Sequence, residues 1–470
     1  MIRRHVLAGM AFSAMDLALV IRHDPARAAG LPSPGRGKEN LRENTMGPHG
    51  DGYFLSSTNP VANVDQRDLE GLAMRLFERP DVRRARDIAR TMWLRVTDRL
   101  MPADQMALFE DHLSDYCFKC TLVAANTDGN YPRVLRVYSE GAEWLGHKVP
   151  GAKWGGDNPD NAYRIVPISP GGRYEVHGRR QIEPSTYVTF QLVGNSTTSQ
   201  TIASLEQLDC EIAADGTYRL TIDEEEANGR PNHLTIRPGT LYLFIRDSMG
   251  DWETQAPDAL RVTRLNPPTR APLGEDELAA TAVRNILSDV FYAYYAQRLF
   301  FNGPQTMTPP EGAGSVGGLV TQMGSLGHFT LAEDEAAILT ANSGGATYRD
   351  IVLHDLWLRS LPNRDRLISL TNAQMKPDAD GRFTYVIARK DPGVHNWLDT
   401  SGLADVLVLH RWQGFPDPKA EKPTIAARKV RLADLEAHLP PGVARVGPQE
   451  RAAQIARRQK AYDRRFAWGD

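Results

Sequence analysis

The feature that most constrains the fold is a set of four short sequence blocks that occur twice, in the same order. One block joins an Asp-Gly turn to a strand-like run, and it occurs at Ala214–Ile222 and again at Ala379–Ile387. The other pairs are Asn232–Leu234 with Asn396–Leu398, Leu241–Arg246 with Val406–Arg411, and, upstream, Tyr187–Leu192 with Tyr348–Leu353. From Ala214 to Ala379 and from Leu241 to Val406 the offset is 165 residues. A repeated order at a nearly constant offset predicts two related domains, and so an internal duplication.

The repeated blocks have the composition of strands. Residues 129–268 contain several short runs rich in β-branched and aromatic residues, and turn signals such as Pro170–Gly172 and Ala214–Gly216 separate them. Similar runs resume at about residue 328 and continue to about 414. This spacing is typical of antiparallel sandwiches. We therefore expect one β-sandwich at 129–268 and a second at 306–425.

Helical patterns surround the two strand-rich regions. Apolar residues recur at helical spacing over 61–128 and over 269–305, which predicts a helical cap and a helical connector. Residues 426–470 are expected to be a C-terminal helical tail, whose basic side chains we interpret as a solvated surface: Arg451, Arg457, Arg458, Lys460, Arg464 and Arg465. The predicted fold class is mainly β with helical additions. It consists of two tandem antiparallel, jelly-roll-like β-sandwiches, an N-terminal helical cap, and central and C-terminal helices.

Composition excludes several classes of partner and cofactor. The net charge of −3 gives no basic field for nucleic acid, so no nucleic-acid partner is expected. No phosphate-binding loop, nucleophile elbow or dinucleotide fingerprint occurs, so we expect no cofactor. The only close cysteine pair, Cys117 and Cys120, lies in a helical pattern without a second pair, which favours buried thiols over a metal site. The expected partner is a small-molecule ligand or substrate, and the sequence does not predict the oligomeric state.

The first 60 residues are expected to be a disordered or signal-like leader and linker. Arg3 and Arg4 precede a mostly apolar stretch at 6–20, and Ala26–Ala28 has the form of a cleavage site. Asp16 interrupts the apolar stretch, which is also too short to span a bilayer, so no integral membrane association is expected. A cytoplasmic location is favoured, with export through a weak N-terminal signal as the alternative.

Several motifs resemble one known family. They are Gly156–Arg164, Tyr174–Arg180, Ile245–Trp252 and, most specifically, Asp391–Thr400 followed by Arg411–Gly414. With these motifs the chain resembles the bacterial "domain of unknown function twelve-fourteen" family over most of residues 65–465. The resemblance implies two sandwich units of jelly-roll type joined to helices. It implies no established reaction, because a fold alone does not confer one.

The candidate catalytic residues are polar groups near strand ends. His177 is expected to share a strand face with Glu175, and such a pair can transfer protons. The Asp391–Asp399 motif offers His395 as a base and Asp399 as the residue that orients it. Arg411 ends the last repeated strand and can bind an oxygen of the substrate. The histidine and aspartate spacings fit no metal-binding pattern, so no metal site is predicted.

The candidate ligand-binding residues gather in loops and at strand ends. Asp157, Asn158 and Asn161 lie in a polar loop between Trp154 and the strand that carries Tyr163 and Arg164. The remaining candidates follow the repeated strands: Arg246, Asp247, Trp252, Asn396 and Trp397. Asx turns and core packing account for many of the same residues in a purely structural interpretation.

Three functional hypotheses follow. The first is a cofactor-independent enzyme of hydrolase or lyase type, which acts on a small, largely apolar or glycosidic molecule in a groove between the two sandwiches. The second is a non-catalytic carbohydrate- or lipid-binding module, in which tryptophans stack on the ligand. The third is an interaction protein that docks through the aromatic segment 291–301.

Overall fold

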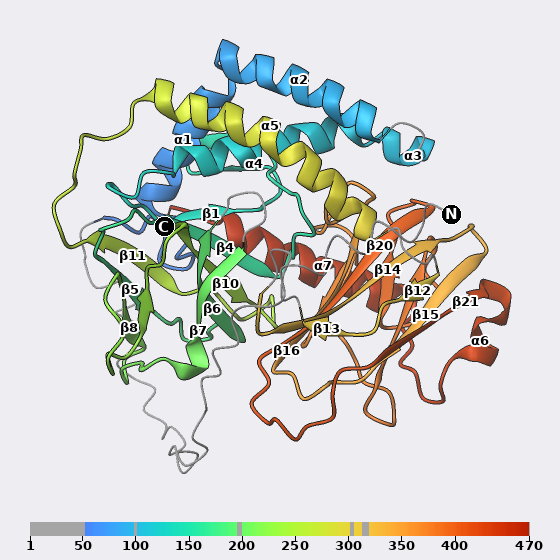
Figure 1. Cartoon of the computed structure of the whole chain (residues 1–470). Coiled ribbons are helices and arrows are strands. Elements are labelled where there is room, and N and C mark those ends of the chain that lie inside the picture. Colours follow the sequence, from blue (N-terminus) through green and yellow to red (C-terminus); the bar gives the residue numbers. More distant parts are fainter. Residues whose placement is uncertain (1–51, 98–100, 195–199, 301–304, 313–318, 470) are drawn as a thin grey trace, which may run out of the picture. The chain divides into compact units, whose positions relative to one another are not determined.

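The computed structural model describes residues 52–97, 101–194, 200–300, 305–312 and 319–469, and for 291–300 it describes the backbone alone. It is mainly β with helical additions, as predicted (Figure 1). Of the predicted leader and linker, residues 1–51 lie outside the described residues, as do the side chains of the aromatic segment 291–301.

The first sandwich has two antiparallel sheets that enclose one apolar core. In one sheet the strand order is β1-β4-β10-β6-β7, and in the other it is β11-β5-β8-β9. Val176, Phe190 and Ile245 come from both sheets and are fully buried in the core between them. The strands are β1 (Leu135–Val137), β4 (Asn161–Pro167), β5 (Tyr174–Arg179), β6 (Tyr187–Gly194), β7 (Gln200–Glu206), β8 (Thr217–Asp223), β9 (His233–Thr235), β10 (Thr240–Ser248) and β11 (Ala259–Arg264).

The second sandwich has the same strand order. Its sheets run β12-β14-β20-β16-β17 and β19-β18-β15-β21, and each sandwich contains one parallel pair, β8 with β9 and β18 with β19. The predicted repeat blocks fall on corresponding strands. The strands are β12 (Thr306–Met307), β13 (Glu311–Gly312), β14 (Gln322–Thr330), β15 (Glu335–Ala341), β16 (Tyr348–His354), β17 (Ser369–Thr371), β18 (Phe383–Ala388), β19 (Trp397–Asp399), β20 (Asp405–Gln413) and β21 (Ile425–Arg431).

The second sandwich extends beyond the predicted boundary at residue 425. Strand β21 pairs along its whole length with β15, so it completes the second sheet rather than opening the C-terminal tail. Its sequence contains Arg428, Lys429 and Arg431, and only Val430 is buried. Charged residues are common on edge strands, where they discourage pairing with other chains, and they hide the strand pattern in the sequence.

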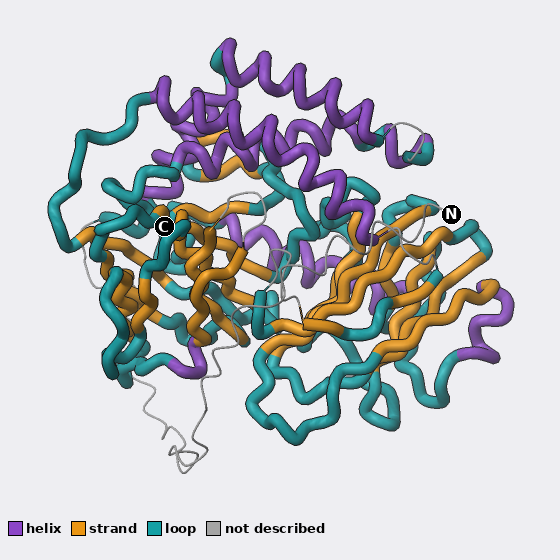
Figure 2. The backbone as a smooth tube through the Cα atoms, viewed as in Figure 1, coloured by secondary structure: helices purple, strands orange, loops and turns teal. Residues whose placement is uncertain are grey.

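Helices cover the outer face of the first large sheet (Figure 2). Leu69, Trp93 and Phe118 of the cap pack with Ile286 of α5 and with Ile165 of β4 in one apolar core. Among the described residues the cap contains four helices, and one of them, α3, is a separate single turn between α2 and α4. The helices are α1 (Val64–Phe77), α2 (Pro80–Val96), α3 (Ala103–Met106), α4 (Phe109–Ala125), α5 (Glu275–Phe300), α6 (Leu435–His438) and α7 (Pro448–Asp463), and the 3₁₀ turn η3 (Arg464–Phe466) follows α7. The small sheet of β2 (Ala142–Trp144) and β3 (His147–Val149) lies between β1 and β4 in the chain.

The C-terminal helix α7 is not a solvated basic surface. Arg451 and Arg458 are buried, while Arg457 and Lys460 are exposed. Arg451 pairs with Asp391 and Arg458 donates to the carbonyl of Ser369, so both hold the helix against the second sandwich. Seven-residue spacing places both arginines on one face of the helix.

Gly178 of β5 tests how closely the first sandwich is packed. A Cβ atom there would lie 2.0 Å from the ring of Tyr218, so Gly178→Ala is expected to cost about 1–3 kcal/mol in the free energy of unfolding. A Cβ atom at Gly312 of β13 would have no neighbouring atom within 4 Å, so Gly312→Ala is the matched control. Urea unfolding of both variants checks this, and equal stabilities would contradict the packing described.

Candidate functional site

The two sandwiches contact each other through corresponding strand ends. Ser248 ends β10 and Gln413 ends β20, and the Ser248 hydroxyl lies 2.9 Å from Gln413 Oε1. These positions are separated by 165 residues, as are Arg246 and Arg411. The two sandwiches therefore meet at equivalent positions, as the two units of a two-fold arrangement do.

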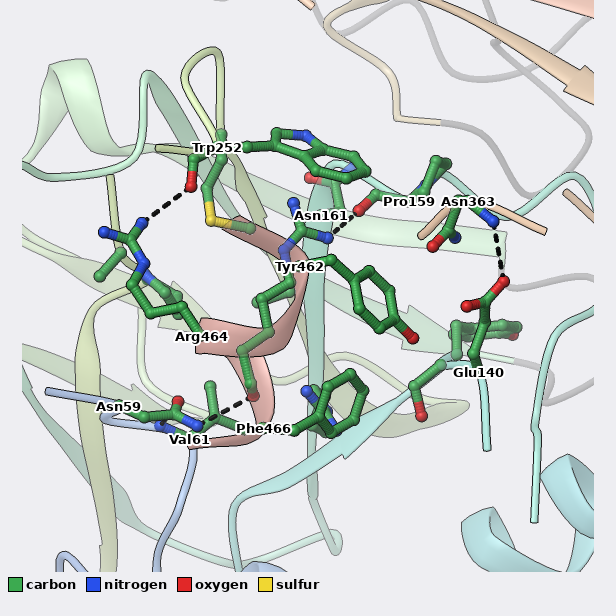
Figure 3. Close-up of a pocket in the computed structure, with 18 of the residues that line it drawn as sticks. Asn59, Val61, Glu140, Pro159, Asn161, Trp252, Asn363, Tyr462, Arg464 and Phe466 are labelled. Atoms are coloured by element: carbon green, nitrogen blue, oxygen red, sulfur yellow. Dashed lines mark hydrogen bonds between the residues drawn. The ribbon is translucent and has the colours of Figure 1, made fainter. Parts of the chain in front are cut away.

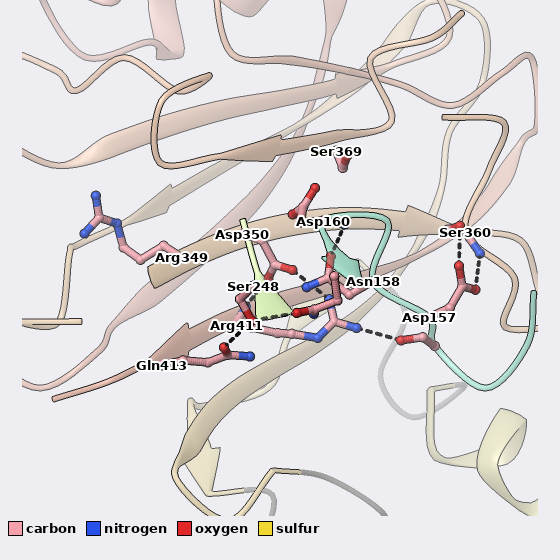
Figure 4. A network of polar contacts seen from close by, with 12 residues as sticks. Asp157, Asn158, Asp160, Ser248, Arg349, Asp350, Ser360, Ser369, Arg411 and Gln413 are labelled. Carbon is pink, nitrogen blue, oxygen red and sulfur yellow. Dashed lines mark hydrogen bonds and ion pairs between the residues drawn. The ribbon is translucent and has the colours of Figure 1, made fainter. Parts of the chain in front are cut away.

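Arg411 joins the second sandwich to the polar loop of the first. Its guanidinium pairs with Asp350 of β16 at 3.0 Å and donates to the carbonyl of Gly156 at 2.6 Å (Figure 4). Gly155 and Gly156 have φ values of +79° and +75°, which glycine adopts readily and other residues avoid. This backbone turns the carbonyl toward the arginine, so Arg411 holds two segments of the chain together.

Tyr348 of β16 connects three side chains of the same interface. Its hydroxyl accepts from Asn158 at 2.9 Å and lies 3.0 Å from Asp160 and 3.2 Å from Asp350. A phenol has one hydrogen, so it donates to only one carboxylate at a time. Burial raises the pKa of Asp350 to about 7 and also raises the pKa of Asp160. The two carboxyl groups therefore compete for one donor inside the protein.

A pocket lies beside this interface, and we name it the Trp252 pocket (Figure 3). Its volume is about 770 Å³, including the part that is open to solvent. The segment before α1, the β1 end, the polar loop, the loop after β10 and the C-terminal turn η3 all contribute to its wall. Its lining includes Val61, Arg136, Tyr138, Glu140, Lys153, Asp157, Asn161, Met249, Trp252, Ala256, Asn363, Tyr462, Arg464, Arg465 and Phe466.

Trp252 is fixed between charged groups. Its indole N–H donates to Asp160 at 2.8 Å. The guanidinium groups of Arg458 and Arg465 lie 4.1 Å and 3.9 Å from its ring centre. Cations over an indole ring are attracted by the negative face of the ring. Burial lowers the pKa of Arg458 to about 9 and that of Arg465 to about 10, and the nearby Asp160 opposes both shifts.

The acidic residues of the lining already have partners. Glu140 accepts from Lys153 and from the backbone N–H of Asn363, both at 3.0 Å. Asp157 accepts from the backbone and the hydroxyl of Ser360. The lining contains four cationic side chains, Arg136, Lys153, Arg464 and Arg465, against these two acids. The pocket is therefore positively charged.

Three of the predicted ligand-binding residues line the Trp252 pocket: Asp157, Asn161 and Trp252. Asn158 and Arg411 lie in the interface network instead. Asn161 accepts from Ser248 at 2.7 Å, so it touches both the pocket and the network. The polar loop thus has a larger part in joining the sandwiches than the sequence suggested.

The predicted catalytic histidines are not brought together. His177 lies on the partly exposed face of β5, where it pairs with Glu175 at 2.5 Å. His395 contacts Gln374 and Gln454, near the start of α7. Asp399 pairs with Arg366 at 3.0 Å rather than with His395. None of these three residues lines the Trp252 pocket.

The remaining predicted residues have structural contacts. Arg164 pairs with Asp247 inside the first sandwich, and Arg246 lies over the ring of Phe244 at 4.2 Å. Tyr163 stacks on the same ring. Trp154 is buried against Tyr116 of the cap. In the second sandwich, Asn396 bonds the backbone at Lys376, and Trp397 donates to the carbonyl of Ala388.

Arg136 and Arg465 line the pocket but are not among the predicted site residues. Arg136 is a single basic residue in the three-residue strand β1, which gives no pattern. Arg465 continues the seven-residue spacing of Arg451 and Arg458, and that spacing was a usable signal of one buried face.

The described residues contain neither a metal-ligand cluster nor a membrane-spanning helix. Within the described ranges, no three His, Cys, Asp or Glu side chains are placed to hold a metal ion. None of the helices in the described part of the chain combines the length and the apolar character needed to cross a bilayer.

The comparison with one solved structure supports the fold. An uncharacterised protein from Burkholderia cenocepacia, known from a crystal structure, matches with a TM-score of 0.64 and 24% identity over 77% of this chain and 99% of its own. The VPA0106 protein from Vibrio parahaemolyticus matches with a TM-score of 0.34 and 11% identity, over 69% of this chain and 100% of its own. No family model and no curated protein matches the chain.

Tyr348→Phe tests the interface network. It removes the donor shared by Asp160 and Asp350, and we expect a loss of about 2–3 kcal/mol in the free energy of unfolding. Because the folded pKa of Asp350 is raised to about 7, the network is most favourable at low pH and weakens as pH rises through 7. The loss is therefore expected to be larger at pH 8 than at pH 5.5, where fewer carboxylates need a donor.

Tyr131→Phe is the matched control. Its hydroxyl makes a single exposed hydrogen bond to the carbonyl of Arg270, so the variant is expected to lose less than about 1 kcal/mol at either pH. Urea unfolding at the two pH values measures both variants. A similar, pH-independent loss in both would show that Tyr348 does not link the two carboxyl groups.

Proposed function

We propose that this protein binds a small molecule in the Trp252 pocket. The observation that carries the proposal is the combination of apolar and aromatic walls with cationic side chains in one hollow. Binding sites for small molecules typically combine apolar walls with a few polar groups that fix the orientation of the ligand. A non-catalytic binding module was the second hypothesis from the sequence, but loops and the C-terminal turn, rather than a set of stacking tryptophans, line this pocket.

The catalytic form of the hypothesis has less support. Among the described residues that line the pocket there is no histidine or cysteine. Burial by itself would raise the pKa of Glu140, but the neighbouring Lys153 ammonium and the hydrogen bonds that the carboxylate accepts lower that pKa below its usual value. Glu140 is therefore a poor general base near neutral pH. We therefore propose binding without catalysis.

We also propose that the two sandwiches arose by duplication. The shared strand order, the parallel pair in each sandwich and the 165-residue offset of contacting positions support this origin. Membership of the "domain of unknown function twelve-fourteen" family stays a proposal that rests on the sequence motifs.

A blocked pocket tests the binding function. Ala256 lines the pocket and is partly exposed, so Ala256→Phe is expected to fill part of the space. Thermal unfolding is measured with a library of small metabolites, because a ligand that binds only the folded state raises the melting temperature. We expect a group of compounds to stabilise the unmodified protein and to lose this effect in Ala256→Phe.

The control is Ala280→Phe, which adds the same ring to an exposed face of α5. This variant is expected to respond to the same compounds as the unmodified protein. A library without a stabilising compound, or stabilisation that persists in Ala256→Phe, would contradict binding in the Trp252 pocket.

A further inference from the structure

Arg136 is a buried cation without hydrogen-bond partners for most of its side chain. Its guanidinium group lies over the rings of Trp144 and Phe466, at 4.5 Å and 4.7 Å from their centres, and these two rings meet edge to face. The residue is 8% exposed and lines the Trp252 pocket. Its Nε and Nη2 atoms have no hydrogen-bond partner among the described residues. Buried polar atoms are nearly always paired, so the unpaired N–H groups require an explanation.

Arg465 brings a second unpaired donor to the same pocket. One of its nitrogens donates to the carbonyl of Pro159, and its Nη2 has no partner among the described residues. Burial is the main cause that lowers the pKa of Arg465, and the positive charge of Arg136 adds to this effect. The positive charges of the two guanidinium groups therefore repel each other, and a negative group in the pocket that both residues line would relieve the repulsion.

The acids near these arginines leave part of the positive charge uncompensated. Glu70 of α1 is the acid whose charge acts on Arg136, and Tyr462 of α7 is the other titratable group that acts on it. Burial raises the pKa of Glu70 to about 7, so near neutral pH this carboxyl group carries only part of a negative charge. Asp160 faces Arg465, but it already accepts from Trp252.

We propose that the Trp252 pocket selects small organic carboxylates, whose acid group is held by Arg136 and Arg465 and whose apolar body contacts the apolar part of the pocket lining. This inference rests on the proposed binding function and names the class of ligand. A guanidinium group holds a carboxylate with two parallel hydrogen bonds, and these bonds are strong where water is excluded. The rings of Trp144 and Phe466 cover part of the Arg136 guanidinium group, and the residue is buried.

Pairs of carboxylates and their primary amides test the proposal. Benzoate, phenylacetate and hexanoate are compared with benzamide, phenylacetamide and hexanamide by isothermal titration calorimetry. The two members of each pair have nearly the same shape and differ in charge. We expect at least one carboxylate to bind about tenfold or more tightly than its own amide, because a charged acceptor strengthens the hydrogen bonds from arginine.

Arg136→Gln and Arg465→Gln identify the groups that recognise the charge. In either variant the preference for the carboxylate over its amide is expected to fall severalfold. Arg173→Gln, which removes an exposed charge from the first sandwich, is the control and is expected to keep the preference. Circular dichroism shows whether each variant folds, and Arg465→Gln keeps the test decisive if Arg136→Gln does not fold.

The possible results of these experiments distinguish a failure of the carboxylate preference from a failure of small-molecule binding itself. Amides that bind as tightly as carboxylates, and are blocked by Ala256→Phe, would overturn the carboxylate preference and leave small-molecule binding in place. A preference that survives in both arginine variants would overturn the assignment of these residues. If no carboxylate of the panel binds, the inference is overturned, and the metabolite screen decides the binding function separately.

The pH dependence of carboxylate affinity gives a further test. If Arg136 had only a structural role, the ionisation of the neighbouring Glu70 would not change that affinity. Glu70 ionises as the pH rises through about 7, and its negative charge then competes with the ligand for Arg136. Carboxylate affinity is therefore expected to fall severalfold between pH 6 and pH 8, and Glu70→Gln is expected to remove this fall. Equal pH profiles in Glu70→Gln and the unmodified protein would contradict the coupling.

Discussion

The Asp160 carboxyl group is the point on which the described structure most depends. It accepts from Trp252 in the first sandwich and from Tyr348 in the second, and it balances the charges of Arg458 and Arg465 in the C-terminal segment. A charge buried this completely is costly unless several donors surround it. Because these donors come from three distant parts of the chain, the carboxyl group specifies how those parts meet.

This arrangement also explains where the pocket lies. The cations that stabilise Asp160 lie over the ring of Trp252, and the turn that carries Arg465 ends at Phe466. Phe466 in turn covers one face of Arg136. The same contacts that close the interface of the sandwiches therefore place two arginines with unpaired N–H groups beside an open space. The Trp252 pocket is therefore a consequence of how the C-terminal segment is fixed.

The sequence predicted the fold better than the site. Repeated strand blocks are local patterns, and residues such as Leu243 and Val408 are buried in strands that alternation and composition reveal. Strand β21 was not predicted, because the charged residues typical of an edge strand hide its alternating pattern.

The site combines residues 58–61, 136–140, 153–162, 249–257 and 462–466, and only non-local contacts bring such segments together. Trp252, which the sequence predicts to bind a ligand, lines the pocket, but the groups over its ring are arginines, and only the seven-residue spacing of Arg451, Arg458 and Arg465 indicated them.

A crystal structure of the protein grown in sodium bromide tests the central claim most directly. Bromide is a small anion whose position is identified by its anomalous scattering, and it binds where N–H donors and positive charge are uncompensated. The account predicts a bromide peak in contact with Nη2 of Arg136 and Nη2 of Arg465, inside the Trp252 pocket. Bromide peaks on the surface together with an empty pocket, or an internal acid paired with both arginines, would contradict it.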